Sequence, residues 1–178
     1  MNPITRLFQP LVLTAWAIST MPQPAACAEY SEYDVKAECI GIFLQGIKWP
    51  AKAFADESAP FIIGICGSDP FGGKVGGPSV GGRNVVVKKS KRIEDLASCH
   101  LIFVSKSESA RIGEILGALR GTNALTVGEA EGFAGKGGII NFVIEDGKVH
   151  YELNPAAARR SGLEISAKIV RLGKLVSS

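Results

Sequence analysis

Several patterns that enzymes commonly require are missing from these 178 residues. There are two histidines, His100 and His150, and no C-x-x-C or H-x-x-x-H spacing, which argues against a dedicated zinc site. No G-x-G-x-x-G motif opens a dinucleotide-binding unit. We therefore expect no catalytic residue, no metal and no cofactor, in a protein that is not an enzyme.

Strong net charge and long apolar runs are also absent. The formal net charge is +3, too small to indicate a nucleic-acid partner. The amino-terminal apolar run, residues 11–18, is far shorter than the roughly 20 residues that span a membrane. It follows Arg6, the one charged residue of residues 1–28, and precedes Ala26, Cys27 and Ala28. This order is typical of a secretory signal, so we expect cleavage after Ala28 and a periplasmic protein.

Two alternatives to simple export stay open. A lipoprotein signal would be cleaved before Cys27 and acylated there, although Pro24 stands where such signals usually carry an aliphatic residue. A signal retained as an anchor is the second alternative. Removing residues 1–28 lowers the net charge to +2 and leaves roughly 150 residues, enough for one domain with a proper core. We expect that single domain to span residues 29–178.

Glycine is abundant in one stretch, PFGGKVGGPSVGGRN at residues 70–84. Backbone N–H groups in such a stretch can approach a phosphate closely. A P-loop, however, has serine or threonine directly after its lysine, and Val75 follows Lys74 here. The sequence GKG at residues 135–137 lacks the hydroxyl as well. We therefore predict a flexible connecting loop that binds no nucleotide.

The remaining chain alternates helical and strand patterns. Ser31 and Asp34 form a capping box before a helix that should end at Pro50 and bury Val35, Cys39, Ile42, Phe43 and Ile47. Short apolar runs predict strands over residues 61–66, 84–88, 100–104 and 124–127. A helical turn is expected over 93–97, and a helix capped by Ser107 over 108–120.

The carboxy-terminal third contains a hairpin pattern. Residues 138–145 and 148–153 flank Asp146 and Gly147, a pair that favours a tight turn. Asn154 and Pro155 then begin a helical region that breaks near Gly162 and resumes to about residue 175. The whole pattern predicts an α/β layered sandwich, with a mostly parallel central sheet, a C-terminal β-hairpin at one edge and helices on both faces.

Cysteine usage allows one disulfide after export. Cys39, Cys66 and Cys99 would remain, an odd number, and Cys39 falls on the predicted buried stripe as an inert thiol. Cys66 and Cys99 are the candidate pair. Cys66 ends one predicted strand and Cys99 precedes another, which would place them at opposite edges of a parallel sheet. A disulfide needs Cα atoms within about 7 Å, so the pairing stays open.

Motifs in a fixed order cover nearly all of residues 31–176. They are YDVKA (33–37) with Phe43 and Trp49-Pro50, GSDPFG (67–72), CHLIFVS (99–105), LTVG (125–128), GF (132–133), Gly138 with NF (141–142), and YELN (151–154) followed by GLEIS (162–166). Together they resemble the YfiR-like family of exported proteins. In that family a helix usually follows the GSDPFG turn, so residues 72–82 resemble a crossover helix lost to glycine.

The resemblance implies regulation. The best understood family member represses a membrane-bound diguanylate cyclase by acting on its periplasmic sensor region, and an outer-membrane lipoprotein relieves the repression, which promotes biofilm formation through cyclic di-GMP. Family members are reported as dimers, so a homodimer is implied here. Cys66 and Cys99 lie near the family's first disulfide positions, Cys66 matching only loosely. The family's second cysteine pair is absent from this chain, which puts redox switching by two disulfides in doubt.

Two functions of different classes follow from these observations. The first is a periplasmic repressor of a diguanylate cyclase. The second is a periplasmic small-ligand sensor module for a histidine kinase or transporter, with a cavity beyond the strand ends near Arg83, Ser105 and Lys106. Trp49 closes the first helix and is either a plug under the sheet or an exposed anchor for a partner.

Overall fold

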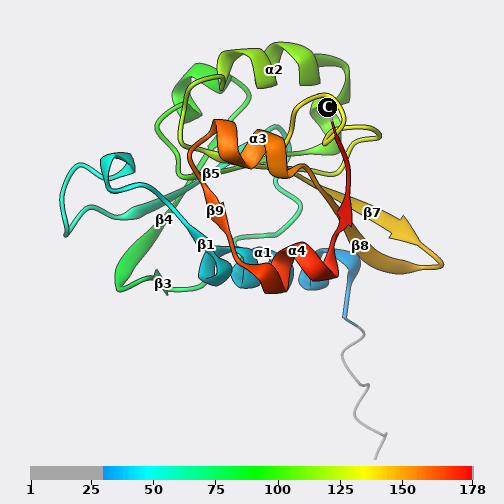
Figure 1. Ribbon diagram of the computed structural model, residues 1–178, viewed down its shortest axis with the longest axis horizontal. Coiled ribbons are helices and arrows are strands. Elements are labelled where there is room, and N and C mark those ends of the chain that lie inside the picture. The colour runs from blue at the N-terminus through cyan, green and yellow to red at the C-terminus, as the bar shows by residue number, and fades with distance from the viewer. Residues whose placement is uncertain (1–29, 178) are drawn as a thin grey trace, which may run out of the picture.

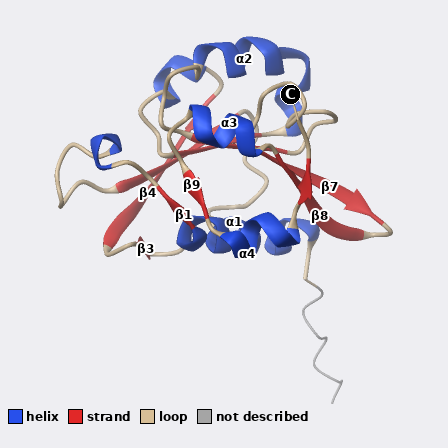
Figure 2. Cartoon of the chain, in the orientation of Figure 1, coloured by secondary structure: helices blue, strands red, loops and turns tan. Residues whose placement is uncertain are grey.

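A computed structural model describes residues 30–177, and the predicted signal, including Cys27, lies outside these residues. One eight-stranded sheet lies between helical layers (Figure 1, Figure 2). The helices are α1 (Glu32–Gly46), α2 (Ile112–Ala118), α3 (Pro155–Arg160) and α4 (Ala167–Leu172), with 3₁₀ turns η1 (Ala51–Ala53), η2 (Ile93–Leu96) and η3 (Lys106–Arg111). The strands are β1 (Ile47–Lys48), β2 (Phe61–Cys66), β3 (Ser79–Val80), β4 (Arg83–Ser90), β5 (Leu101–Val104), β6 (Leu125–Gly128), β7 (Ile140–Glu145), β8 (Lys148–Leu153), β9 (Glu164–Ile165) and β10 (Lys174–Leu175).

The sheet confirms the predicted fold class. Its strand order is β10-β8-β7-β6-β5-β2-β4-β3, and the pairs from β4 through β7 are parallel. β7 and β8 form the expected hairpin, with Asp146 and Gly147 both at positive φ in the turn. The hairpin lies next to the edge, because β10 adds a two-residue strand beyond β8.

Alternating side chains divide the core into two clusters, one on each face of the sheet. In β2, Phe61, Ile63 and Ile65 pack on the face that α1 covers, whereas Cys66 belongs to the opposite face, covered by α2. Figure 1 shows α1 and α4 on one side of the sheet and α2 on the other. Strands buried on both faces read as continuous apolar runs, which is why β2 occupies its predicted bounds, residues 61–66.

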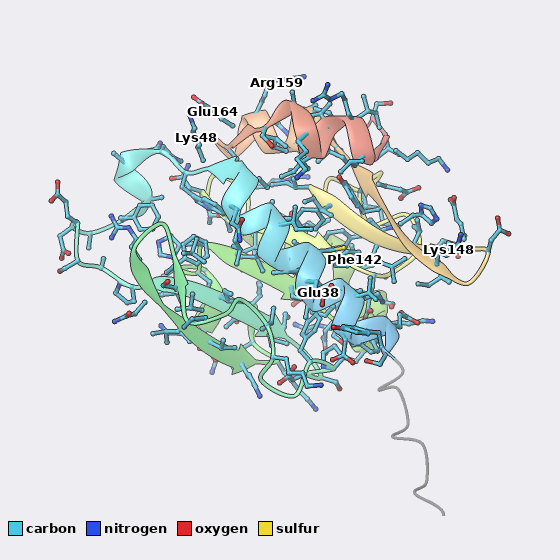
Figure 3. All side chains as sticks on the ribbon, turned by 90° about the horizontal axis from the view of Figure 1, so that it is seen from below. Glu38, Lys48, Phe142, Lys148, Arg159 and Glu164 are labelled. Atoms are coloured by element: carbon cyan, nitrogen blue, oxygen red, sulfur yellow. The ribbon has the colours of Figure 1, made fainter. Side chains whose placement is uncertain are left out.

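The first helix begins as predicted but buries a different face. Ser31 and Asp34 form the capping box, and Asp34 accepts the Ser31 N–H at 3.1 Å. The helix ends at Gly46 rather than Pro50, because the next two residues pair with β9. The predicted stripe is wrong at Ile42, which is 49% exposed, while Lys36 is buried. Figure 3 shows α1 crossing the sheet, with Phe142 of β7 beneath it.

The glycine-rich crossover between β2 and β4 contains no helix within the part of the chain that is described, as expected. It is nevertheless fastened to the core, since Phe71 and Val75 are both buried. Gly76, at φ +89, lies so close to Ile63 that a Cβ would overlap the isoleucine side chain. The segment is therefore a packed crossover that requires glycine at this close approach.

Two predicted helices are replaced by shorter elements. Over residues 108–120, a 3₁₀ turn capped by Ser105 precedes α2, which begins at Ile112. After α3, the chain forms β9, α4 and β10 instead of one helix to residue 175. Figure 3 shows Lys48 and Glu164 side by side, where β1 and β9 pair in a separate two-stranded sheet.

Candidate functional site: an aromatic groove at the sheet edge

A groove of about 420 Å³ opens at the edge where the parallel strands begin. Its walls come from the end of α1, the segment after β1, the start of β2 and the β3–β4 turn. Trp49 and Arg83, both singled out from the sequence, line this groove together with Phe54 and Phe61. The fold therefore brings together two candidate contact residues that are 34 positions apart in the sequence.

Stacked rings form one side of the groove. The Trp49 ring meets Phe61 edge to face at 4.9 Å, and Phe54 stacks on His100 at 4.5 Å between ring centroids. Trp49 is half-buried, and its Nε1 donates a hydrogen bond to the His100 carbonyl oxygen at 3.1 Å. Trp49 thus plugs the sheet end and also presents part of its ring to the groove.

Arg83 is used structurally at the rim. Its Nη1 donates to the carbonyl oxygens of Asp56 and Ala59, at 2.8 and 2.7 Å. The guanidinium also lies 4.1 Å from the centroid of the Phe54 ring, in a cation–π arrangement. These contacts hold the loop between η1 and β2 against the groove.

His100 lies behind the rings as a neutral imidazole. Its Nδ1 accepts the Ile62 N–H at 2.9 Å, and its Nε2 lies 3.0 Å from the Ala53 carbonyl oxygen. This pattern fits the tautomer with its proton on Nε2. A second proton, on Nδ1, would point at the Ile62 N–H and would remove the acceptor of that hydrogen bond. Burial lowers the pKa of His100 below its ordinary value of 6.5, and the nearby Arg83 charge lowers it further.

Stability should therefore fall in mild acid. The pKa of His100 is lower in the folded than in the unfolded chain. The neutral imidazole therefore contributes fully to the free energy of unfolding above about pH 6.5, and this contribution declines as the pH drops through that value. The slope from this one group cannot exceed about 1.4 kcal/mol per pH unit. Urea unfolding between pH 8 and pH 5 measures it. His100→Gln should flatten the slope, and His150→Gln, at an exposed position, should keep it; equal slopes in both variants would contradict the assignment.

Ser105 and Lys106 lie at the opposite edge, so the predicted cavity shared with Arg83 is wrong. Arg83 begins β4, whereas both other residues follow β5, and strands β4, β2 and β5 run parallel. At this edge the polar groups satisfy one another. Ser105 Oγ caps η3, and the Lys106 N–H donates to Glu129 Oε1 at 3.0 Å.

The two candidate disulfide cysteines share one apolar cluster on the α2 face. Cys99 Sγ lies beside Gly64, 3.0 Å from the position that a Cβ would occupy there. Gly64 and Cys66 are two residues apart on β2 and point to the same face. The segment before β5 thus brings Cys99 over the middle of β2, on the same face as Cys66, rather than to the opposite edge of the sheet. Both cysteines are free thiols in the structure, and a bond between them stays a prediction.

In the reduced protein, Cys66 should react slowly with alkylating reagents. Burial and the negative charge of Glu108 raise its pKa to about 11, against an ordinary value of 9.0. Because the thiolate is the nucleophile, alkylation at pH 8 is expected to be about a hundredfold slower than in the urea-unfolded chain. Peptide mass spectrometry of quenched samples measures both rates. Similar rates would show that Cys66 is accessible in the folded protein.

Two charged residues that sequence reasoning missed are the buried pair Lys36 and Glu129. Lys36 falls on an apolar helix pattern, and its partner is 93 residues away, so no local signal marks the pair. Its Nζ lies 2.7 Å from Glu129 Oε2 and 2.5 Å from Glu32 Oε1. Burial opposes the lysine charge, but hydrogen bonds to the two carboxylates outweigh it and raise the pKa of Lys36.

Residues 30–177 contain no group of three histidine, cysteine or acidic side chains that could hold a metal ion. Within the same residues, no helix has the length and apolar character needed to cross a bilayer.

The chain belongs to the family described as YfiR/HmsC-like, whose sequence pattern matches residues 33–174. A crystal structure described as a conserved domain protein from Vibrio cholerae O1 biovar El Tor is similar at 13% identity and a TM-score of 0.46. The match covers 66% of this chain and 55% of that one, so this chain aligns with about half of its length. No protein of curated function matches the sequence significantly.

Proposed function

We propose that this protein is an exported regulator that represses an inner-membrane diguanylate cyclase by binding the periplasmic sensor region of that enzyme. The observation that carries the proposal is the YfiR/HmsC-like match over residues 33–174, nearly the whole described domain. Repression of this kind needs no chemistry from the regulator. It requires only that the regulator bind the inactive state of the sensor more tightly than the active state.

The aromatic groove is the surface we assign to this contact. Its conspicuous polar groups already bind within the protein, Trp49 Nε1 to His100 and Arg83 Nη1 to the loop before β2. The groove therefore presents mainly apolar surface to a bound partner, and Leu44, Ile47 and the aromatic rings supply this surface. An apolar side chain of a partner protein suits such a surface, since buried anchors in pockets dominate many protein interfaces.

A genetic experiment tests the function. Deleting the gene should raise cellular cyclic di-GMP and surface attachment, and expressing the exported protein should restore both. In a strain that also lacks the cyclase, the deletion should change neither. Unchanged cyclic di-GMP in the strain with an intact cyclase would contradict the proposal.

Two matched variants test the surface. Val80→Glu places a carboxylate in the groove, whereas Val86→Glu places one on the exposed side of neighbouring β4, where Val86 is 41% exposed. Val86→Glu should repress like the wild type, and Val80→Glu should fail although it is exported and folded by circular dichroism. Full repression by folded Val80→Glu would exclude the groove but not the function.

Three associated features belong to the same proposal. They are relief of repression by an outer-membrane lipoprotein, a homodimer in solution, and export with cleavage after Ala28. Amino-terminal sequencing of the periplasmic protein reads the cleavage site, and light scattering reads the dimer.

A further inference from the structure

The outer edge of β4 is open along more than half of the strand. On its inner side β4 pairs with β2 over residues 85–90, but on its outer side β3 covers only Arg83 and Asn84. Figure 2 shows β3 and β4 at one end of the sheet, opposite to β7 and β8. Within residues 30–177, no strand pairs with the outer side of β4 beyond Val85.

Two glycines prevent β3 from continuing along this edge. The Val85 N–H still reaches the crossover, where it donates to the Pro78 carbonyl oxygen at 3.1 Å. The two residues before Pro78 are Gly77, at φ +65, and Gly76, at φ +89, which lies against Ile63. Because an extended strand requires negative φ, the crossover turns away from β4 at these glycines and leaves the rest of the edge uncovered.

The free backbone groups of the open edge belong to Val87 and Lys89. Successive residues of a strand direct their N–H and C=O groups to opposite sides. The Ser90 carbonyl oxygen accepts the Gly67 N–H at 3.1 Å on the inner side, whereas the Val85 N–H donates on the outer side. Val87 and Lys89 alternate in step with Val85, so their N–H and C=O groups face outward. A further strand could pair with all four groups.

A lysine without a carboxylate partner stands between these groups. Lys88 and the nearby Lys91 are exposed, and neither forms an ion pair with a residue that the structure describes. The carboxylates nearby have other partners: Asp69 lies 2.5 Å from Lys89, Glu94 lies 3.9 Å from Arg92, and Asp95 accepts the Ser90 hydroxyl at 2.8 Å. Because opposite charges on cross-strand neighbours stabilise a sheet, an added strand gains from an acidic side chain opposite Lys88.

A second copy of this chain suits the edge poorly. Two-fold antiparallel pairing of β4 with another β4 uses all of the free groups only when Val87 lies opposite Lys89. That register sets Lys88 directly opposite the Lys88 of the other copy, and like charges in that position destabilise the pair. The edge therefore discriminates against its own copy and favours an acidic strand.

We propose that the open edge of β4 binds an extended acidic segment of a partner protein, which adds a strand to the sheet. Hydrogen bonds to the backbone of Val87 and Lys89 hold the segment, and its acidic side chain opposite Lys88 selects it. None of these three residues lines the aromatic groove, so this site is separate from the repressor contact proposed above. Its failure would leave the proposed repression intact.

Amide hydrogen exchange, followed residue by residue by NMR on the purified protein, tests the edge. Without a partner, the Val87 and Lys89 amides should exchange roughly tenfold or more faster than the Lys88 amide, which faces β2. A capped heptapeptide of alternating valine and glutamate should slow both amides saturably, whereas the matching valine–lysine peptide should not. Unchanged exchange with the glutamate peptide, or equal protection by the lysine peptide, would overturn the proposal.

Two further measurements exclude other occupants. A valine–glutamate peptide that is N-methylated at its four central residues keeps its charge but lacks N–H donors, so it should bind far more weakly by fluorescence anisotropy. Equal binding of the two peptides would show attraction by charge alone and overturn strand addition. Protection of Val87 and Lys89 that rises with protein concentration, without peptide, would show that a second copy covers the edge and would also overturn the proposal.

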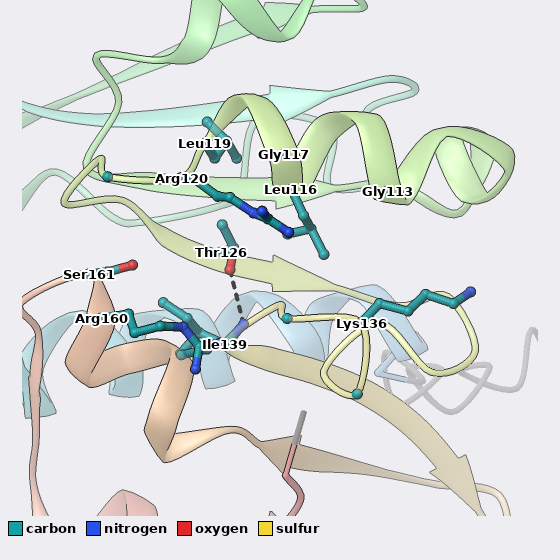
Figure 4. Close-up of a pocket in the computed structure, with 14 residues that line it drawn as sticks. Gly113, Leu116, Gly117, Leu119, Arg120, Thr126, Lys136, Ile139, Arg160 and Ser161 are labelled. Carbon is teal, nitrogen blue, oxygen red and sulfur yellow. Dashed lines mark hydrogen bonds between the residues drawn. The ribbon is translucent and has the colours of Figure 1, made fainter.

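Matched variants locate the binding. Lys88→Gln should weaken the valine–glutamate peptide roughly tenfold. Lys136→Gln should not, although it also removes an exposed lysine, because Lys136 lines a cavity of about 550 Å³ between α2 and α3, remote from β4 (Figure 4). Lys89→Pro removes one outward N–H and keeps the bonds to β2, so it should bind weakly while folded by circular dichroism. Wild-type affinity in folded Lys88→Gln and Lys89→Pro, or lost affinity in Lys136→Gln, would overturn the assignment.

Discussion

Replacing Lys36 with methionine is expected to lower the free energy of unfolding by about 3–5 kcal/mol, the usual cost of removing one partner from a buried ion pair. The side chains of Lys36 and Glu129 are 4% and 3% exposed, and their charged atoms lie 2.7 Å apart. Methionine keeps an apolar side chain of similar length, but it removes the ammonium that lies over the Tyr33 and Phe142 rings and leaves the Glu129 carboxylate buried without its cation. Urea unfolding at pH 7 measures the change.

The exposed pair Lys74 and Asp34 provides the matched control. Its atoms are 2.9 Å apart, but the lysine side chain is 70% exposed and solvent screens the pair, so Lys74→Met should cost far less than Lys36→Met. Adding Glu129→Gln to Lys36→Met should recover part of the loss, because a neutral amide can still accept the Lys106 N–H without an unpaired charge. A cost for Lys36→Met similar to that of Lys74→Met would refute the assigned role.

Alkaline pH should weaken the same interaction. Because the pKa of Lys36 is raised above its ordinary value of 10.5, the contribution of its charge is complete below that pH and is lost as pH rises through the folded value. The wild type should therefore lose stability relative to Lys36→Met only in strong alkali.

Phe133→Ala is expected to lower the free energy of unfolding by a similar amount, about 3–5 kcal/mol. Phe133 is fully buried in the cluster under α2. Its ring lies between two glycines, so closely that a Cβ at Gly128 would come within 2.5 Å of the ring and one at Gly138 would overlap it. Removing the ring would open a large cavity between β6 and the start of β7. Thermal and urea unfolding both report the loss.

The glycines that flank the Phe133 ring allow the converse test, in which a side chain is added instead of removed. Gly138→Ala should itself destabilise by about 1–3 kcal/mol through overpacking, and less when Phe133 is already alanine. Gly135 lies in the same loop, and a Cβ there would make only an ordinary 3.5 Å contact, so Gly135→Ala should be nearly neutral. Additive effects of Gly138→Ala and Phe133→Ala would show that the two positions do not share one packing site.

The sequence predicts the sheet better than the helices, for a physical reason. β2 is covered on both faces, so its apolar run has no competing register. α1 has apolar residues on several sides. Lys36 is buried because its charge is paired with Glu32 and with the distant Glu129, and the sequence pattern, which shows no sign of Glu129, placed Ile42 on the buried face instead. β9 and β10 are two residues each and form because β1 and β8 pair with them. Local patterns cannot indicate such pairing.

The site was predictable in part. Trp49 at a helix end next to a proline indicated either a plug under the sheet or an exposed anchor, and the structure shows a half-buried ring whose Nε1 donates to the His100 carbonyl oxygen. Grouping Arg83 with Ser105 was an avoidable error, since a residue before one parallel strand and a residue after another lie at opposite edges.

The pairing of β1 with β9 joins the end of the first helix to a segment near the carboxy terminus. A Cβ at Gly46, the last residue of α1, would come within 2.7 Å of Ile169 in α4, so the end of the first helix is covered by nearly the last segment of the chain. During synthesis, α1 emerges first and its apolar end stays uncovered until residue 169 follows. Burial of the end of α1 therefore depends on contacts between distant parts of the sequence. Such contacts favour slow folding, which leaves time for a chaperone to bind the incompletely folded chain.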